Sequence, residues 1–247
     1  MKVSAVFMDY DGTIAPLDVE RERSAVAGPL FSLLGEISSR IPVAVITSKD
    51  VGFVRPRTGF AWAWAGVLGL ELRLRDGSGR TTAVPKGLSE ALPKVKALLP
   101  TGVEVEEKRG TDGTLLGASI DWRKMREAPR RELESAERLF AGEGLPVHDH
   151  PERMFLDVYA APMDKGSAFR SLAEMLGAGR PIMYLGDMSE DNDAFDAADI
   201  PICVKNDDKA GSLRCRYSVS FREVEGIFAR LLADGLEFAG ELGGAVS

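Results

Sequence analysis

The feature that most constrains the fold is a set of four short apolar runs that alternate with segments of helical periodicity. The runs lie at residues 3–8, 41–46, 181–186 and 200–204, and helices are predicted at 28–39 and 189–198. Continuous apolar strands that alternate with helices are typical of a parallel sheet covered on both faces. The sequence therefore predicts an α/β fold.

Polar residues follow three of these runs, at the points where the strands are expected to end. Asp9, Asp11 and the turn residue Gly12 follow the first run, Thr47 follows the second, and Asp187 follows the third. Parallel α/β sheets bind ligands at the carboxyl ends of their strands. We therefore expect these polar side chains to converge on one crevice.

The middle of the chain has a different pattern. Helices are predicted at 88–99 and 128–140, and half-buried strands at 103–108, 115–122, 146–150 and 154–159. An α-β-β-α-β-β series whose strands have one polar face predicts an antiparallel sheet backed by helices. We therefore predict a smaller α+β cap domain at 84–160, inserted into a core that is formed by 1–83 and 161–247.

Composition excludes several classes of partner. The 247 residues are 45% hydrophobic and 28% charged, which is typical of a soluble globular protein with one core and a smaller companion domain. The net charge of −7 leaves no basic stripe for a nucleic acid. The longest apolar stretch, 61–70, is about half of what a membrane span needs. We predict neither a nucleic acid nor a membrane as partner, and a monomer or weak homo-oligomer.

The chain has two cysteines, Cys203 and Cys215. They could form a disulfide, but a lone pair in a chain of this length is more typical of two reduced core thiols. The sequence therefore predicts reduced cysteines and a cytoplasmic location.

The paired carboxylates Asp9 and Asp11 indicate a particular chemistry. A carboxylate can attack phosphorus to form an aspartyl phosphate, but it and the phosphate repel, so a divalent cation has to lie between them. Asp187 and, one helical turn further on, Asp191 supply more acid. Ligand sets made only of oxygen favour Mg2+ over zinc.

Several residues also have simpler interpretations. Alone, Thr47 is typical of a strand end, and Lys165 of a solvated surface lysine. Trp62 and Trp64 could form a sugar-stacking face, although core packing is favoured. Other polar or aromatic residues are predicted to be surface or core positions without chemistry: His148, His150, Asp193, Asp196 and Asp199 at the surface, and Phe195 in the core.

Order and spacing add a resemblance to a known family. The pattern consists of Asp9-x-Asp11-Gly12-Thr13, Thr47, Lys165 before Gly166, and Gly186-Asp187 with Asp191. It resembles the haloacid dehalogenase (HAD) superfamily, whose four motifs occur in this order. The resemblance implies a Rossmann-like core with a cap between the second and third motifs. It also implies a phosphatase, because dehalogenases of this superfamily lack the second acid and the metal.

The resemblance assigns a role to each motif residue. Asp9 is the expected nucleophile and a Mg2+ ligand, and Asp11 is the general acid and base that also offers its backbone carbonyl to the metal. Thr47 is expected to hydrogen-bond the phosphoryl group, and Lys165 to neutralise charge on nucleophile and phosphate. Asp187 is expected to bind Mg2+, and Asp191 to support the metal site directly or through water.

The chain also resembles the trehalose-6-phosphate phosphatase family. The resemblance rests on Tyr10, 106–108, 121–123 and 186–195. It implies a phosphosugar substrate, with Thr47, Ser48, Glu106, Lys108, Arg123 and Asp157 as its binding residues. The chain departs from the family's usual residues at 48–49, 121–122, 157, 188 and 190, and Glu106 and Lys108 alone are also typical of a solvated strand face.

The sequence therefore predicts a magnesium-dependent phosphatase that hydrolyses a phosphorylated sugar, trehalose 6-phosphate or a related one, through an aspartyl phosphate. Two alternatives remain open at this point. One is a phosphosugar mutase or phosphotransferase, which moves the same phosphoryl group back to sugar. The other is a non-catalytic phosphosugar-binding protein, against which the intact set of Asp9, Asp11, Lys165 and Asp187 argues.

Overall fold

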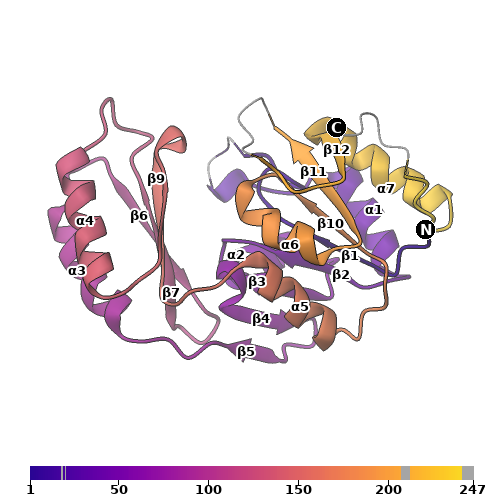
Figure 1. Cartoon of the computed structure of the whole chain (residues 1–247), viewed down its shortest axis with the longest axis horizontal. Coiled ribbons are helices and arrows are strands. Elements are labelled where there is room, and N and C mark those ends of the chain that lie inside the picture. The colour runs from indigo at the N-terminus through magenta and orange to yellow at the C-terminus, as the bar shows by residue number, and fades with distance from the viewer. Residues whose placement is uncertain (18, 20, 207–211, 241–247) are drawn as a thin grey trace. The chain divides into compact units, whose positions relative to one another are not determined.

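The computed structural model describes residues 1–17, 19, 21–206 and 212–240. It divides into two compact units (Figure 1). The core unit consists of Met1–Arg80 and Met163–Ser247, and the insert unit is Thr81–Pro162. The sequence pattern predicts an inserted domain at 84–160, and its role as a cap stays a prediction.

A mixed sheet forms the centre of the core unit. Its strand order in the described residues is β12-β11-β10-β1-β2-β3-β4-β5. The strands are β1 (Ala5–Met8), β2 (Val43–Ile46), β3 (Ala63–Gly66), β4 (Glu71–Leu74), β5 (Gly79–Thr81), β10 (Ile182–Gly186), β11 (Ile200–Lys205) and β12 (Tyr217–Ser220). The six strands from β12 to β3 are parallel, and β4 runs antiparallel to β3. The predicted α/β fold with a largely parallel sheet is confirmed.

The strand β1 lies at the point where the strand order reverses. It pairs in parallel with β2 on one side and with β10 on the other, so that Met8 lies beside both Val45 and Leu185. Residues that follow these three strands therefore leave the sheet at the same edge. This is the place at which open α/β sheets bind ligands.

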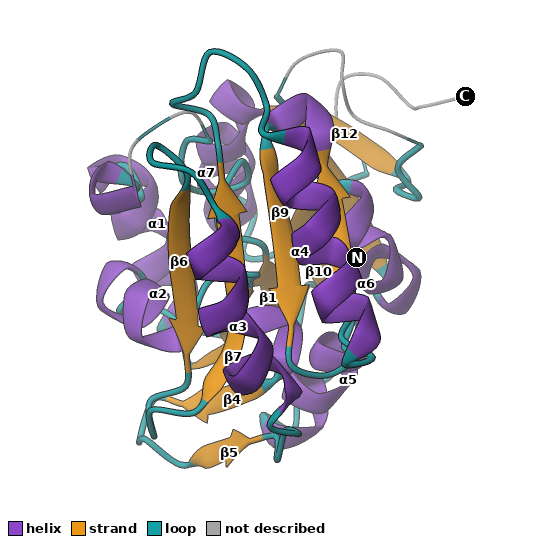
Figure 2. Cartoon of the chain, turned by 90° about the vertical axis from the view of Figure 1, so that its left-hand side faces the viewer, coloured by secondary structure: helices purple, strands orange, loops and turns teal. Residues whose placement is uncertain are grey.

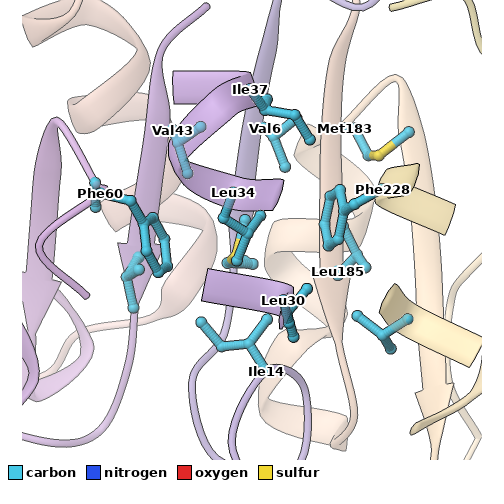
Figure 3. Packing of buried hydrophobic residues seen from close by; sticks show 14 of the residues in the cluster. Val6, Ile14, Leu30, Leu34, Ile37, Val43, Phe60, Met183, Leu185 and Phe228 are labelled. Atoms are coloured by element: carbon cyan, nitrogen blue, oxygen red, sulfur yellow. The ribbon is translucent and has the colours of Figure 1, made fainter. Parts of the chain in front are cut away.

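Helices cover both faces of this sheet (Figure 1). They are α1 (Gly28–Ser38), α2 (Val51–Arg57), α5 (Lys165–Met175), α6 (Asn192–Ala197) and α7 (Val224–Ala233). Alternate residues of β1 point to opposite faces: Val6 and Met8 join a hydrophobic cluster with α1 and α7 (Figure 3), and Ala5 and Phe7 join one with α5 and α6. The central strands β1, β2 and β10 are thus buried on both sides, which explains why they are continuously apolar.

Side-chain caps begin two of these helices. The carboxylate of Asp50 accepts the N–H of Phe53 at 2.7 Å and begins α2. The carboxylate of Asp164 accepts the N–H of Ser167 at 2.7 Å and begins α5. Such caps satisfy amide groups that lack a partner in the first turn. The second cap fixes Lys165 as the first residue of its helix.

The insert unit is an antiparallel sheet backed by two helices (Figure 2). The strand order is β6-β7-β9-β8, and the elements are α3 (Gly87–Leu98), β6 (Glu104–Arg109), β7 (Leu115–Asp121), α4 (Arg130–Gly142), β8 (Val147–His150) and β9 (Phe155–Tyr159). Ala118, Ile120, Leu156 and Val158 pack against α3 and α4 in one hydrophobic cluster. The predicted α-β-β-α-β-β series is confirmed, and the opposite face of the sheet is polar.

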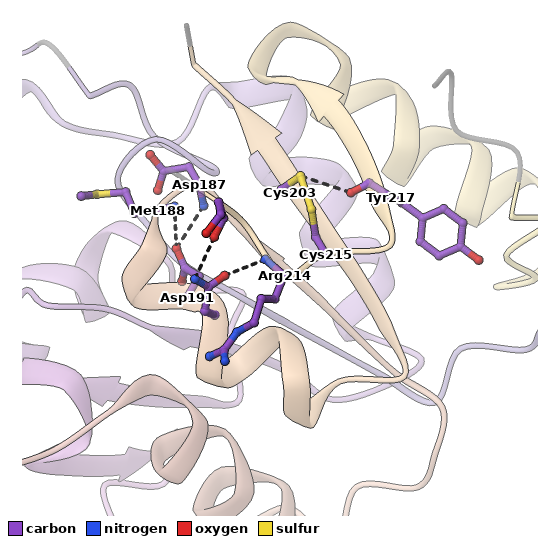
Figure 4. The surroundings of a disulfide bond; sticks show 9 residues. Asp187, Met188, Asp191, Cys203, Arg214, Cys215 and Tyr217 are labelled. Carbon is purple, nitrogen blue, oxygen red and sulfur yellow. Dashed lines mark hydrogen bonds between the residues drawn. A yellow bond between two sulfur atoms is a disulfide. The ribbon is translucent and has the colours of Figure 1, made fainter. Parts of the chain in front are cut away.

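One prediction from the sequence is wrong. Cys203, on β11, and Cys215, just before β12, are joined as a disulfide (Figure 4), with their Cα atoms 5.7 Å apart. The parallel strands β11 and β12 are paired with Ile202 beside Tyr217, so Cys215, two residues before Tyr217, lies close to Cys203. The prediction of a cytoplasmic location therefore loses the support that it took from reduced thiols.

Several other expectations about surface and core are confirmed, whereas His148, His150 and Asp199, which were predicted at the surface, are half-buried. Phe195 is fully buried, and Asp193 and Asp196 are exposed and pair with Arg214 at 2.9 and 3.2 Å. Trp64 packs in the core and donates its indole N–H to the hydroxyl of Thr58 at 2.8 Å. No helix within the described ranges has the length and apolar character that a bilayer crossing requires.

Candidate active site

The nucleophile candidate Asp9 lies directly after β1 and is only 5% exposed. The ammonium group of Lys165 lies 3.0 Å from its Oδ1 atom. Lys165 comes from the first turn of α5, which the Asp164 cap holds in place. Asp9 and Lys165, which the sequence predicted as members of one site, therefore form a buried ion pair.

Burial and neighbouring charges shift both groups. Burial raises the pKa of the Asp9 carboxyl well above its ordinary value; Lys165 counteracts this shift, and Asp191 and Asp187 add to it. Burial alone would lower the pKa of Lys165, but Asp191, Asp9 and Glu190 outweigh it, and the net pKa is raised. The lysine is thus held as a cation, whereas burial and the neighbouring carboxylates disfavour the charged form of Asp9, which positive charge beside it would favour.

Asp187, at the end of β10, approaches the turn that follows β1. Its Oδ2 accepts a hydrogen bond of 3.2 Å from the side-chain amide of Asn206, which also donates to the backbone carbonyl of Gly12 at 2.6 Å. Asn206 comes directly after β11. One amide group therefore ties three segments of the sheet edge together.

Asp191 accepts four hydrogen bonds. Its Oδ1 accepts from Lys165 Nζ at 2.7 Å and from the hydroxyl of Tyr184 at 2.6 Å. Its Oδ2 accepts from the backbone N–H groups of Asp187 at 3.1 Å and Met188 at 3.0 Å (Figure 4). Gly186 makes this possible, because a Cβ atom there would lie 2.4 Å from Cγ of Asp191.

The acidic residues around this edge fit a divalent cation. Asp9, Asp187 and Asp191 are all buried, and each offers a carboxylate oxygen within 4.8 Å of the others. Three buried carboxylates beside a single lysine leave an excess of negative charge, which a hard cation with oxygen ligands would balance. The donor set therefore fits Mg2+.

Asp11 lies two residues after Asp9 and is more accessible, with a quarter of its side chain exposed. Its Oδ1 accepts from the hydroxyl of Ser24 at 3.0 Å, and Lys49 Nζ lies 3.9 Å from its Oδ2. A carboxylate with hydrogen-bonded neighbours and access to solvent can exchange a proton with a bound group or with water.

Thr47 lies at the end of β2 and is buried. Its Oγ1 accepts the backbone N–H of Lys49 at 3.1 Å, which leaves the hydroxyl proton to be donated elsewhere. Ser48 follows it and is half-buried. The loop after β2 therefore carries both residues that were predicted there.

Four of the six predicted phosphosugar-binding residues lie in the insert unit, and two of these, Lys108 and Asp157, are hydrogen-bonded to each other. Lys108 donates to Oδ1 of Asp157 at 2.9 Å, and both side chains are almost fully buried. Ser119 donates to the same oxygen, and Tyr159 donates to Oδ2 at 3.0 Å. Between Lys108 and Tyr159 the neighbouring strand carries Gly117, which leaves the space across which the lysine reaches.

The other two predicted residues of the insert unit have different surroundings. Glu106 lies in register with Ser119, Asp157 and His148 across the sheet, so these side chains share its polar face. Arg123 follows β7, and its Nε atom donates to Asp121 at 2.9 Å, with half of the arginine side chain exposed. Glu106 thus lies in the same cross-strand row of side chains as Asp157, and Arg123 lies after the end of β7.

Four residues of the core site were not predicted from the sequence: Ser24, Lys49, Tyr184 and Asn206. Ser24 contacts Asp11 only through tertiary structure, so spacing along the chain carried no signal for it. Lys49 and Asn206 follow strand ends, and that position could have marked them. Tyr184 looked like one more apolar residue of β10.

No known protein-family model matches the sequence. The chain is 30% identical to a trehalose-phosphate phosphatase of Mycobacterium avium, over 94% of this chain and 63% of that protein. It is 28% identical to the trehalose-phosphate phosphatase of Mycobacterium tuberculosis, over 83% of this chain and 54% of that protein. The chain thus spans less than two thirds of the length of these curated relatives.

Two solved structures have a similar fold. A trehalose-6-phosphate phosphatase related protein superimposes with a TM-score of 0.74 at 19% identity, over 94% of this chain and 99% of that one. A haloacid dehalogenase-like hydrolase from Bacteroides thetaiotaomicron superimposes with a TM-score of 0.70 at 14% identity, over 93% of this chain and all of the other.

Strand order, an inserted α+β unit and an acidic site at the end of β1 thus define a protein with the haloacid dehalogenase-like fold. Within that fold, its sequence is similar to those of the trehalose-phosphate phosphatases. Both resemblances predicted from the motifs are confirmed.

Proposed function

We propose that this chain is a magnesium-dependent phosphatase that hydrolyses a phosphorylated sugar through an aspartyl phosphate on Asp9. The observation that carries the proposal is the buried Asp9–Lys165 pair, 3.0 Å apart, among carboxylates whose oxygens lie within 4.8 Å of one another. A structural ion pair would not need this surplus of buried acid at a strand end, since unpaired buried charge is costly. A phosphoryl-transfer site does need it, to hold a metal.

In the first step an Asp9 oxygen attacks phosphorus as the bond from phosphorus to the sugar oxygen breaks. Asp11, in its protonated form, gives its proton to the departing oxygen. Lys165 and the hydroxyl of Thr47 hold the phosphoryl oxygens and offset their charge. A water molecule then attacks the aspartyl phosphate, Asp11 takes a proton from that water, and phosphate and Asp9 are released.

Mg2+, when bound, supplies positive charge that lets the anionic nucleophile and phosphate approach each other. We assign Asp9 and Asp187 as its carboxylate ligands, with the backbone carbonyl of Asp11. Asp191 has each oxygen already occupied by two hydrogen bonds, so we assign it a supporting role. Removal of Mg2+ by a chelator should stop turnover, and added Mg2+ should restore it.

For the substrate we propose a phosphosugar of the trehalose 6-phosphate type, bound by Glu106, Lys108 and residues near them. The support is the similarity to trehalose-phosphate phosphatases and the polar face of the insert sheet. Asp157 accepts hydrogen bonds from Lys108, Ser119 and Tyr159, so its role in this proposal is to hold Lys108. The cytoplasmic location stays a prediction.

The test is phosphate release from 4-nitrophenyl phosphate and from a panel of phosphorylated mono- and disaccharides. Asp9→Asn should abolish release from all of them while the protein stays folded, and the matched control Asp193→Asn, an exposed aspartate, should leave release unchanged. Full turnover by Asp9→Asn would refute the mechanism. Isomerised sugar phosphate in place of free phosphate would identify a mutase instead.

A further inference from the structure

Tyr184 is a buried hydroxyl of the core unit with no role in the steps above. It lies on β10, is fully buried, and donates to Oδ1 of Asp191 at 2.6 Å. The same oxygen accepts from Lys165 Nζ at 2.7 Å. Lys165 in turn lies 3.0 Å from Asp9. Tyr184 is therefore connected to the nucleophile by three contacts, through Asp191 and Lys165.

The ring of Tyr184 is fixed by its neighbours. It packs edge-on against Phe169 of α5 and Phe195 of α6, with ring centroids 6.0 and 5.5 Å away. Aromatic side chains packed in this way keep one orientation, and the buried site leaves no bulk water to take the place of the hydroxyl. The hydroxyl is therefore a permanent donor to Asp191.

The hydrogen bond from Tyr184 affects how the ammonium group of Lys165 is shared between the carboxylates of Asp191 and Asp9. Its distances to Asp191 and Asp9 are nearly equal, 2.7 and 3.0 Å, so a small change in either carboxylate moves the balance. A hydroxyl that donates to Oδ1 of Asp191 withdraws negative charge from that oxygen and weakens its hold on the lysine. Without the hydroxyl, the ammonium group would move toward Asp191 and away from Asp9.

We propose that Tyr184 is a positioning residue for phosphoryl transfer, which acts through Asp191 to keep Lys165 directed at Asp9 and at the phosphoryl group. The inference rests on the proposed function, because it gives Lys165 a task in that reaction. Charge on the phosphoryl oxygens changes most in the transition state, so the effect should fall on kcat more than on KM.

The experiment compares Tyr184→Phe with the matched control Tyr217→Phe, whose hydroxyl lies away from Asp187 and Asp191 (Figure 4). With 4-nitrophenyl phosphate and Mg2+, Tyr184→Phe should lower kcat about tenfold and leave KM within about twofold. Vanadate, which mimics the transition state, should bind the variant about tenfold more weakly in calorimetry, whereas inorganic phosphate should bind it almost unchanged. Tyr217→Phe should match the unmodified chain in all four measurements.

A double-variant cycle separates positioning from mere packing. If Tyr184 acts through Asp191, then Tyr184→Phe should have no further effect on kcat in an Asp191→Asn background, whereas a packing defect would add to it. Additive effects, or a Tyr184→Phe variant with normal kcat and vanadate affinity, would overturn the inference. An unmodified chain that releases no phosphate would instead refute the proposed function. In that case the difference in vanadate affinity between the unmodified chain and Tyr184→Phe would still test whether Tyr184 positions Lys165.

Discussion

A Cβ atom on Gly12 would lie 2.2 Å from Oδ2 of Asp187. Gly12 has a φ of +77°, a conformation that residues with a side chain rarely adopt. The turn after β1 therefore requires glycine at position 12 for two reasons: the backbone is left-handed there, and the carboxylate of Asp187 occupies the place of a side chain. This contact brings the ends of β1 and β10 together in one site.

We expect Gly12→Ala to lower activity at least a hundredfold, because Asp187 has to move and the metal ligands separate. The left-handed backbone alone should cost about 1 kcal/mol of unfolding free energy. The matched control is Gly77→Ala, since Gly77 has a φ of +89° but a Cβ atom there would meet nothing within 4 Å. Denaturant titration and Mg2+-dependent turnover of both variants test this. Equal activity in the two would show that the contact with Asp187 is unimportant.

Thr13 offers a prediction about stability. Its side chain is fully buried, and its hydroxyl has no hydrogen-bond partner among the described residues. A buried unsatisfied hydroxyl is destabilising, and valine has nearly the same shape. We expect Thr13→Val to raise the unfolding free energy by about 1 kcal/mol.

The control for Thr13 is Thr58→Val. Thr58 is also fully buried, but its hydroxyl donates to Val54 and accepts from Trp64 at 2.8 Å each. Loss of the Thr58 hydroxyl should lower the unfolding free energy by about 2 kcal/mol, because the indole N–H of Trp64 is left without an acceptor. A Thr13→Val variant as unstable as Thr58→Val would mean that the Thr13 hydroxyl has a partner after all.

Lys108 and Asp157 form a buried pair, so a single substitution leaves a charge behind. We expect Lys108→Ala to lower the unfolding free energy by about 3 kcal/mol, and the joint Lys108→Met and Asp157→Leu variant to lower it less. The joint variant should still hydrolyse 4-nitrophenyl phosphate, while its KM for the preferred phosphosugar rises at least tenfold. An equal change in KM for both substrates would refute the assignment of Lys108 to sugar binding.

The disulfide between Cys203 and Cys215 should contribute to stability. It closes a short loop, with 12 residues of separation along the chain, and such loops are worth about 3 kcal/mol in the unfolded-state entropy model. We expect a reductant to lower the denaturant midpoint of the unmodified chain and to leave that of a Cys203→Ser and Cys215→Ser variant unchanged. A midpoint that does not respond to reductant in the unmodified chain would contradict this.

Sequence patterns predicted the buried centre of the fold better than its edge. The runs that became β1, β2, β10 and β11 are apolar throughout because both faces of these strands are covered. The strands β3, β4 and β5 were not predicted. β3 has four residues inside one long apolar stretch, and the short strands β4 and β5 are partly exposed. The helix α2 was hidden by Pro56 within it.

The candidate site shows the same division. Asp9, Thr47 and Asp187 could be predicted because strand ends in a parallel sheet meet at one edge. Tyr184, which holds Asp191, and Asn206, which holds Asp187, could not, because a hydrogen bond that forms only in the folded chain leaves no periodic trace in the sequence. The prediction of reduced cysteines failed for a related reason. The sequence does not show that Cys203 and Cys215 are close in space until the pairing of β11 with β12 is known.

The pairing of β1 with a strand on each side has a further consequence. Each step along a strand advances about 3.3 Å and turns the side chain to the other face. Insertion or deletion of one residue before Asp9 would therefore carry the carboxylate out of reach of Lys165 and exchange Val6 and Met8 with Phe7 between the two layers of helices. Reactivity and solubility would be lost in the same event. The number of residues in β1 is thus as strictly determined as the identity of the acid that follows it.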